Sequence, residues 1–178
     1  MTPGALADLL TLGRMALAPV IAVVVGADNL AAGVVVLIAA WLTDLADGRL
    51  ARLRPGTSHL GAWDPLADAA IGAGLLAGLS ASGRVTPVFA GIFIVVLGGG
   101  LVVLRNLALG MLLQAVAYAF LFGALWNDAR EWFWALVIAV VPIAVIDGAR
   151  LVRVILPDFF GGVRKLVPGD ATPTEEET

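Results

Sequence analysis

Six apolar stretches divide the chain, and their length is the strongest constraint on its fold. They cover residues 9–26, 30–46, 66–83, 85–104, 107–126 and 132–156. A helix needs about 20 such residues to cross about 30 Å of hydrocarbon. Only 14% of the side chains are charged, whereas soluble domains carry roughly a quarter. We therefore predict an all-α, polytopic membrane protein with six transmembrane helices in one bundle.

The basic residues predict how this bundle is oriented. If the N-terminus is cytoplasmic, nine of the eleven Lys and Arg residues fall on the cytoplasmic side, and only Arg84 and Arg130 fall on the other. This distribution follows the positive-inside rule. We therefore expect an integral protein of the cytoplasmic membrane. We expect both termini in the cytoplasm, a membrane domain over residues 1–160, and a polar, disordered cytoplasmic tail over residues 161–178.

Carboxylates concentrate between the second and third apolar stretches. Five residues there are three or four apart on one expected helix and so share a stripe. They are Asp44, Asp47, Gly48, Ala51 and Arg52. On the next helix Asp64 and Asp68 share a face, and Pro65 suits the first turn. If the two helices pack antiparallel, four carboxylates converge at the cytoplasmic rim.

Such a cluster suggests metal chemistry. Four carboxylates with no nearby lysine repel one another unless cations neutralise them. Oxygen ligands suit Mg²⁺ or Mn²⁺, and the absence of cysteine excludes a thiolate site. Two such ions can hold the attacking and leaving oxygens of a phosphoryl transfer, and Arg52 and Arg54 suit phosphate oxygens. The residues thus predict a metal-dependent enzyme acting on a phosphorylated lipid.

Two other classes of protein remain as alternatives. A cation transporter could use the carboxylates as an ion pathway, but the other apolar stretches offer almost no polar residues deeper in the membrane. A non-enzymatic membrane scaffold could retain the cluster without turnover. The glycine and alanine of the stripe leave a groove beside the carboxylates, where a ligand could approach the backbone.

The stretch resembles the signature of the CDP-alcohol phosphatidyltransferases, D-x2-D-G-x2-A-R-x8-G-x3-D-x3-D. The corresponding residues are Asp44, Asp47, Gly48, Ala51, Arg52, Gly61, Asp64 and Asp68. The segment "LTLGRMALAP" at residues 10–19 is similar to the family's first-span pattern LT-x2-R-x4-P. One departure is visible: two residues, Ala62 and Trp63, separate Gly61 from Asp64 where the family has three.

The resemblance implies transfer of a phosphatidyl group from CDP-diacylglycerol to an alcohol, with release of CMP. It implies two divalent ions, Mg²⁺ or Mn²⁺, and Asp68 as the general base. The implied metal ligands are Asp44, Asp47, Asp64 and Asp68. The implied nucleotide-binding residues are Asp44, Asp47, Gly48, Ala51, Arg52 and Gly61. The resemblance also implies that the protein forms a homodimer and is surrounded by membrane lipids. We expect its active site to face the cytoplasm, and we expect no nucleic-acid partner.

The acceptor alcohol is suggested by smaller features. "DPLAD" at residues 64–68 and the first-span pattern resemble the phosphatidylglycerophosphate synthase and cardiolipin synthase branches more than the inositol-phosphate branch. We expect glycerol-3-phosphate, with a cardiolipin synthase-type or inositol-phosphate acceptor as the alternatives. An acceptor phosphate needs cations, for which the candidates are Arg105, Arg150 and Arg153. Arg150 and Arg153 could equally be interfacial anchors, and Arg150 could pair with Asp147.

Overall fold

The computed structural model describes residues 3–53, 63–150 and 156–166, and its regular structure there is entirely helical, which confirms the all-α prediction. The helices are α1 (Pro3–Gly26), α2 (Leu30–Leu53), α3 (Asp64–Ala81), α4 (Pro87–Phe93), α5 (Gly99–Leu104), α6 (Leu107–Asp128), α7 (Arg130–Arg150) and α8 (Leu156–Arg164). A π-helical segment, Ile94–Gly98, joins α4 to α5, so that the three form one rod.

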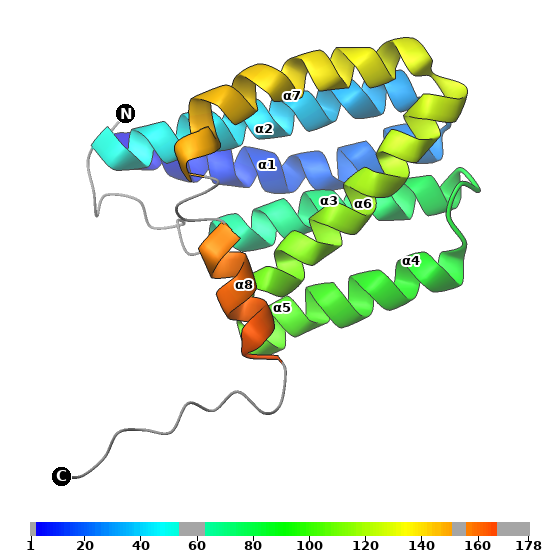
Figure 1. Ribbon diagram of the computed structural model, residues 1–178. Helices are drawn as coiled ribbons and strands as arrows, with labels where there is room; N and C mark the ends of the chain where they lie inside the picture. Colours follow the sequence, from blue (N-terminus) through cyan, green and yellow to red (C-terminus); the bar gives the residue numbers. More distant parts are fainter. Residues whose placement is uncertain (1–2, 54–62, 151–155, 167–178) are drawn as a thin grey trace, which may run out of the picture.

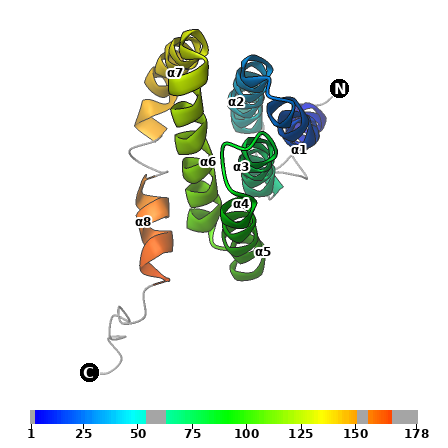
Figure 2. The same ribbon diagram turned by 90° about the vertical axis from the view of Figure 1, so that its right-hand side faces the viewer.

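The longer helices form two layers. Helices α1, α2, α3 and the α4–α5 rod run side by side, while α6 crosses them obliquely (Figure 1). Seen along these helices, α6 and α7 form the second layer (Figure 2). Helix α1 packs against both α2 and α3, which make little direct contact with each other. The first helix is therefore the element that connects the two aspartate-bearing helices, instead of the direct α2–α3 packing that we considered from the sequence.

Three helical segments are long and apolar enough to cross a membrane within the part of the chain that the structure describes. They are Asp8–Gly26, Pro87–Leu104 and Leu107–Asp128, and the apolar segment Leu30–Ala46 is somewhat shorter. Helices also form where the other two spans were predicted, as α3 and α7. Apolar helices of this kind indicate an integral membrane protein.

The C-terminal boundary differs from the one expected from the sequence. We predicted that a disordered tail begins at residue 161, but α8 continues to Arg164. Pro157 lies in the first turn of this helix, where a missing backbone N–H breaks no helical hydrogen bond. The predicted disorder of the tail from residue 167 onward falls outside the described residues.

Glycines bring α1 and α3 into close contact. A Cβ atom on Gly74 would collide with the carbonyl oxygen of Ala18, and one on Gly78 would lie 2.9 Å from the carbonyl oxygen of Ala22. Small residues at a helix interface allow such an approach of the backbones. The two helices run parallel, because Ala18 lies beside Gly74 and Ala22 beside Gly78. This packing aligns the first half of α1 with the start of α3.

We expect Gly74→Ala to lower the thermal unfolding midpoint of the detergent-solubilised protein. The added methyl group meets a backbone oxygen that cannot rotate away, and overpacking of this kind costs about 1–3 kcal/mol. The matched control is Gly91→Ala, because a Cβ there meets nothing within 4 Å. Both changes gain the same helix propensity, so the difference between them reports packing. Equal midpoints would show that the α1–α3 contact is looser than described.

Candidate active site

The site is built around one buried cation, Arg14 of α1. Only 1% of its side chain is exposed, although it lies in a predominantly apolar helix. Its Nη1 donates to Oδ1 of Asp44 at 2.7 Å and to Oδ1 of Asp68 at 2.5 Å. Its Nη2 lies 3.8 Å from Oδ1 of Asp64. One guanidinium therefore contacts carboxylates from both α2 and α3.

Thr11 adds a second contact from the same helix. Its hydroxyl donates to Oδ1 of Asp64 at 2.9 Å, and its side chain is buried. Thr11 and Arg14 are three residues apart, so they share one face of α1. Asp64 is the first residue of α3 and is followed by Pro65, which is well suited to a first helical turn. Helix α1 thus holds both aspartates of α3 at the start of that helix.

The carboxylates keep an open side. The exposed fraction of the side chain is 48% for Asp44, 36% for Asp64 and 37% for Asp68. A buried arginine is costly unless it is paired, and its planar fork of five donors can serve several carboxylates at once. Three carboxylates against one guanidinium leave the group negative. The result is a partly neutralised group of carboxylates, with the cation of Arg14 buried beneath them.

The remaining residues of the stripe continue along α2. Asp47, Gly48, Ala51 and Arg52 all lie in this one helix, which runs to Leu53. Gly48 is half-buried, and the side chains of the other three fall outside the described part of the structure. Gly61 lies in the segment 54–62, which is also outside the described residues. The structure therefore brings together the side chains of three of the four predicted aspartates.

The arginines predicted for an acceptor phosphate are placed less fully. Arg105 lies in the turn between α5 and α6, where it is exposed and has a left-handed φ of 50°. It lines a cleft against α8, and the lining of that cleft includes none of the three aspartates around Arg14. Arg150 is the last residue of α7, but its side chain is not described. Arg153 lies outside the described residues.

The donor chemistry of the site suits a hard divalent cation, since partly exposed carboxylate oxygens are the ligands that Mg²⁺ and Mn²⁺ prefer. Within residues 3–53, 63–150 and 156–166, no three Asp, Glu or His side chains are arranged to hold a metal ion. The guanidinium of Arg14 instead lies among the described carboxylates. The fourth carboxylate, Asp47, belongs to the same stripe but is not described beyond its backbone.

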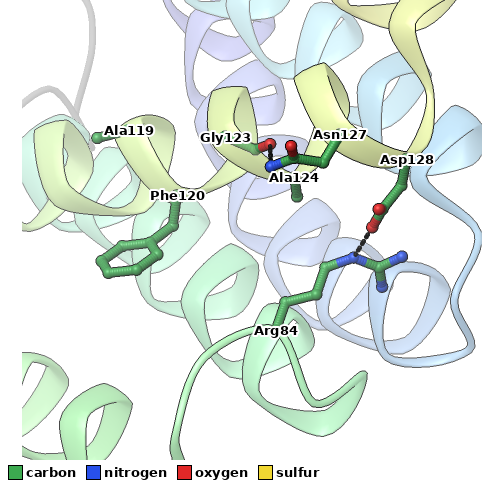
Figure 3. Close-up of a pocket in the computed structure, with 7 residues that line it drawn as sticks. All are labelled: Arg84, Ala119, Phe120, Gly123, Ala124, Asn127 and Asp128. Atoms are coloured by element: carbon green, nitrogen blue, oxygen red, sulfur yellow. Dashed lines mark hydrogen bonds and ion pairs between the residues drawn. The ribbon is translucent and has the colours of Figure 1, made fainter.

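A separate cavity lies at the opposite end of the bundle (Figure 3). It has a volume of about 410 Å³ and is lined by Arg84, Ala119, Phe120, Gly123, Ala124, Asn127 and Asp128. Arg84 donates through Nε to Asp128 at 2.9 Å and pairs through Nη1 with Asp28. Burial alone would lower the pKa of Arg84, but the hydrogen bonds to Asp28 and Asp128 raise it above its ordinary value. These groups tie the α1–α2 and α3–α4 turns to the end of α6.

Arg14 and Thr11 were not predicted to be site residues. From the sequence, Arg14 is only one of the basic residues of the cytoplasmic side, and no partner within the chain was predicted for the carboxylates. A signal was present, because the first-span pattern LT-x2-R-x4-P contains both residues at a spacing that puts them on one helix face. What the pattern could not reveal is that α1 lies between α2 and α3.

Comparison with known proteins assigns the chain to a family. A family model described as CDP-alcohol phosphatidyltransferase matches residues 4–146, which include Arg14 and all four aspartates. Searches of curated proteins and of solved structures found no match to the chain. The matched family is a phosphotransferase family whose chemistry is phosphatidyl transfer in phospholipid synthesis, generally with divalent metal ions. The match covers well over half of the chain, which therefore belongs to the CDP-alcohol phosphatidyltransferase family.

Proposed function

We propose that this enzyme transfers the phosphatidyl group of CDP-diacylglycerol to the hydroxyl of glycerol-3-phosphate and releases CMP. The observation that carries the proposal is the group of three signature aspartates around the buried guanidinium of Arg14. The group is negative and partly exposed, as a site for cation-bound phosphates must be. Membership in the family supports the same class of reaction.

In the proposed reaction, the acceptor hydroxyl oxygen forms a bond to the phosphorus that carries diacylglycerol. The bond from that phosphorus to the CMP phosphate oxygen breaks, and the electron pair leaves with CMP. The hydroxyl proton passes to Asp68, which acts as the general base. Arg14 contacts Oδ1 of Asp68 and so orients the carboxylate, and we assign the proton to Oδ2.

The four aspartates, Asp44, Asp47, Asp64 and Asp68, are the proposed ligands of two Mg²⁺ or Mn²⁺ ions. When bound, such ions stabilise the charge that develops on the phosphate oxygens. Gly48, Ala51 and Gly61 would lie against the nucleotide, and Arg52 would contact its phosphates. Support for this assignment comes from the oxygen-only donor set and from the single helix that carries the stripe.

The wider organisation remains part of the proposal: a membrane domain over residues 1–160 with six spans, pairing as a homodimer, and a site that faces the cytoplasm. The nine-to-two distribution of basic residues supports this orientation. Helix α8 and the start of α1 lie at the same end of the bundle (Figure 1), as expected for termini on one side. Arg105, Arg150 and Arg153 are the proposed contacts of the acceptor phosphate.

The direct test is CMP release from CDP-diacylglycerol by the purified protein. We expect CMP with Mg²⁺ and glycerol-3-phosphate, and none after chelation of the metal, because the aspartates would then face the pyrophosphate without its counter-ions. Phosphatidylglycerol and inositol phosphate serve as competing acceptors. CMP release with only one of these two would show that glycerol-3-phosphate is not the acceptor. Nucleotide binding without CMP release for any acceptor would favour a non-enzymatic scaffold.

A further inference from the structure

Helix α8 presents an uncovered apolar stripe. Leu156, Phe160 and Val163 are four and three residues apart, so they share one face of the helix. Their exposed fractions are 41%, 64% and 37%. The neighbouring positions carry Pro157, Asp158 and two glycines, so the apolar groups are gathered on one side. An amphipathic helix of this kind is suited to the boundary between water and hydrocarbon.

The position of α8 agrees with such a boundary. It runs across the direction of α1–α5 in both views (Figures 1 and 2) and lies beside the junction of α5 and α6. The Nδ2 of Asn106 donates to the carbonyl oxygen of Gly162 at 2.9 Å and ties α8 to this junction. Two of the candidate spans, Pro87–Leu104 and Leu107–Asp128, meet there. Helix α8 therefore lies at the depth where two membrane spans end.

The glycine in this contact is required by its geometry. A Cβ atom on Gly162 would lie 2.7 Å from both the Cβ of Ala108 and the Oδ1 of Asn106. That same Oδ1 accepts from the backbone N–H of Ala108 and so caps α6. One side chain, Asn106, thus both starts α6 and holds α8. The orientation of α8 is fixed by specific contacts with the end of a span.

Positive charge lies next to the apolar stripe. A cleft of about 580 Å³ separates α8 from the α5–α6 turn, and its lining includes Arg105, Lys165 and Asp158. Both basic side chains are exposed. Basic residues beside a membrane-surface helix attract the negatively charged headgroups of a lipid leaflet. With two basic residues and one acidic residue, the charge of this cleft is complementary to an anionic lipid surface.

We propose that α8 is a membrane-surface helix that binds anionic lipid. Its apolar stripe enters the lipid in the plane of the membrane, and Arg105 and Lys165 meet the headgroup phosphates. This inference rests on the geometry of α8 and on the candidate spans. Arg105 is shared with the proposed contacts of the acceptor phosphate, but the depth of a label on α8 is read without acceptor, metal or turnover, so the two proposals can fail separately.

The absence of cysteine from the chain allows a direct test on the full-length protein. Phe160→Cys places a nitroxide label on the apolar stripe, and Asp158→Cys places the matched control on the same helix but off the stripe. In phosphatidylcholine nanodiscs we expect the label at 160 to collide more with oxygen than with a water-soluble nickel chelate. The label at 158 should show the reverse.

The charge component is tested by adding phosphatidylserine to the nanodiscs, since this anionic lipid is not one of the candidate acceptors. We expect the label at 160 to move deeper, and we expect this shift to be lost in the double variant Arg105→Gln, Lys165→Gln. Equal access of nickel to both labels would overturn the proposal, because α8 would then lie in water. Spin–spin broadening confined to position 160 would also overturn the proposal, because it would show that the apolar stripe packs against a second copy of the chain. An unchanged depth in phosphatidylserine would refute anionic lipid binding.

Discussion

Replacing Arg14 with methionine is expected to lower CMP release about 10–100-fold, which is the usual cost of losing a residue that orients catalytic ligands. Methionine fills similar space but leaves three carboxylates without the cation that they share. Their mutual repulsion should also lower the thermal midpoint. Breaking a fully buried pair costs about 3–5 kcal/mol, and the partial exposure of these aspartates reduces that figure.

A conservative variant of Arg14 distinguishes a role in positioning the carboxylates from a role in packing alone. Arg14→Lys keeps the charge but loses the planar fork, so we expect it to restore stability more than turnover. Arg130→Met is the control for loss of a cation, because Arg130 lies at the opposite end of the bundle over the ring of Trp126. Turnover and its dependence on Mg²⁺ should be measured together with the midpoint. Wild-type turnover in Arg14→Met would show that Arg14 does not position the carboxylates for catalysis.

Asp68→Asn should abolish most turnover while sparing nucleotide binding. Loss of a general base typically costs about 10²–10⁴-fold in rate. Asparagine keeps the shape of the side chain and one oxygen that can accept from Nη1 of Arg14, so we expect α3 to remain in place. The measurements are CMP release and the affinity for a cytidine nucleotide by calorimetry. Glu131→Gln, at the exposed start of α7 and at the opposite end of the bundle, is the control for loss of a carboxylate.

The two measurements distinguish the possible roles of Asp68. A large loss of turnover with unchanged nucleotide affinity and unchanged metal dependence supports the role of base. A rise in the Mg²⁺ concentration needed for activity indicates instead that Asp68 acts mainly as a metal ligand. An active Asp68→Asn protein would show that Asp68 is not the general base.

The helices could be predicted from the sequence because apolar length determines them. The stretch expected at 107–126 forms α6 at Leu107–Asp128, and the stretch expected at 85–104 forms the rod from Pro87 to Leu104. The π-helical segment within that rod has no sequence signal that we recognised. Helix α8 was missed because Pro157 and the Gly161–Gly162 pair suggest turns. In the structure, this segment is helical and is held against α6 by the hydrogen bond from Asn106 to Gly162.

The site could be predicted only in part, because spacing along one helix says nothing about which helix lies beside it. The i,i+3 and i,i+4 spacings put Asp44 on the stripe and Asp64 with Asp68 on one face. The partner of all three, Arg14, is 30 residues from Asp44 and 54 from Asp68 in the sequence. That contact depends on the close approach at Gly74 and Gly78, which only a three-dimensional structure reveals.

The burial of Arg14 also has a consequence for the order of membrane insertion. Helix α1 leaves the ribosome before α2 and α3, so its arginine meets the bilayer before either carboxylate-bearing helix has been synthesised. An unpaired arginine at the centre of a span costs about 2.5–3.5 kcal/mol on insertion scales. Near the end of a span the side chain can instead extend toward the headgroups until its partners arrive. The paired position of Arg14 is therefore reached only once α2 and α3 have packed against α1.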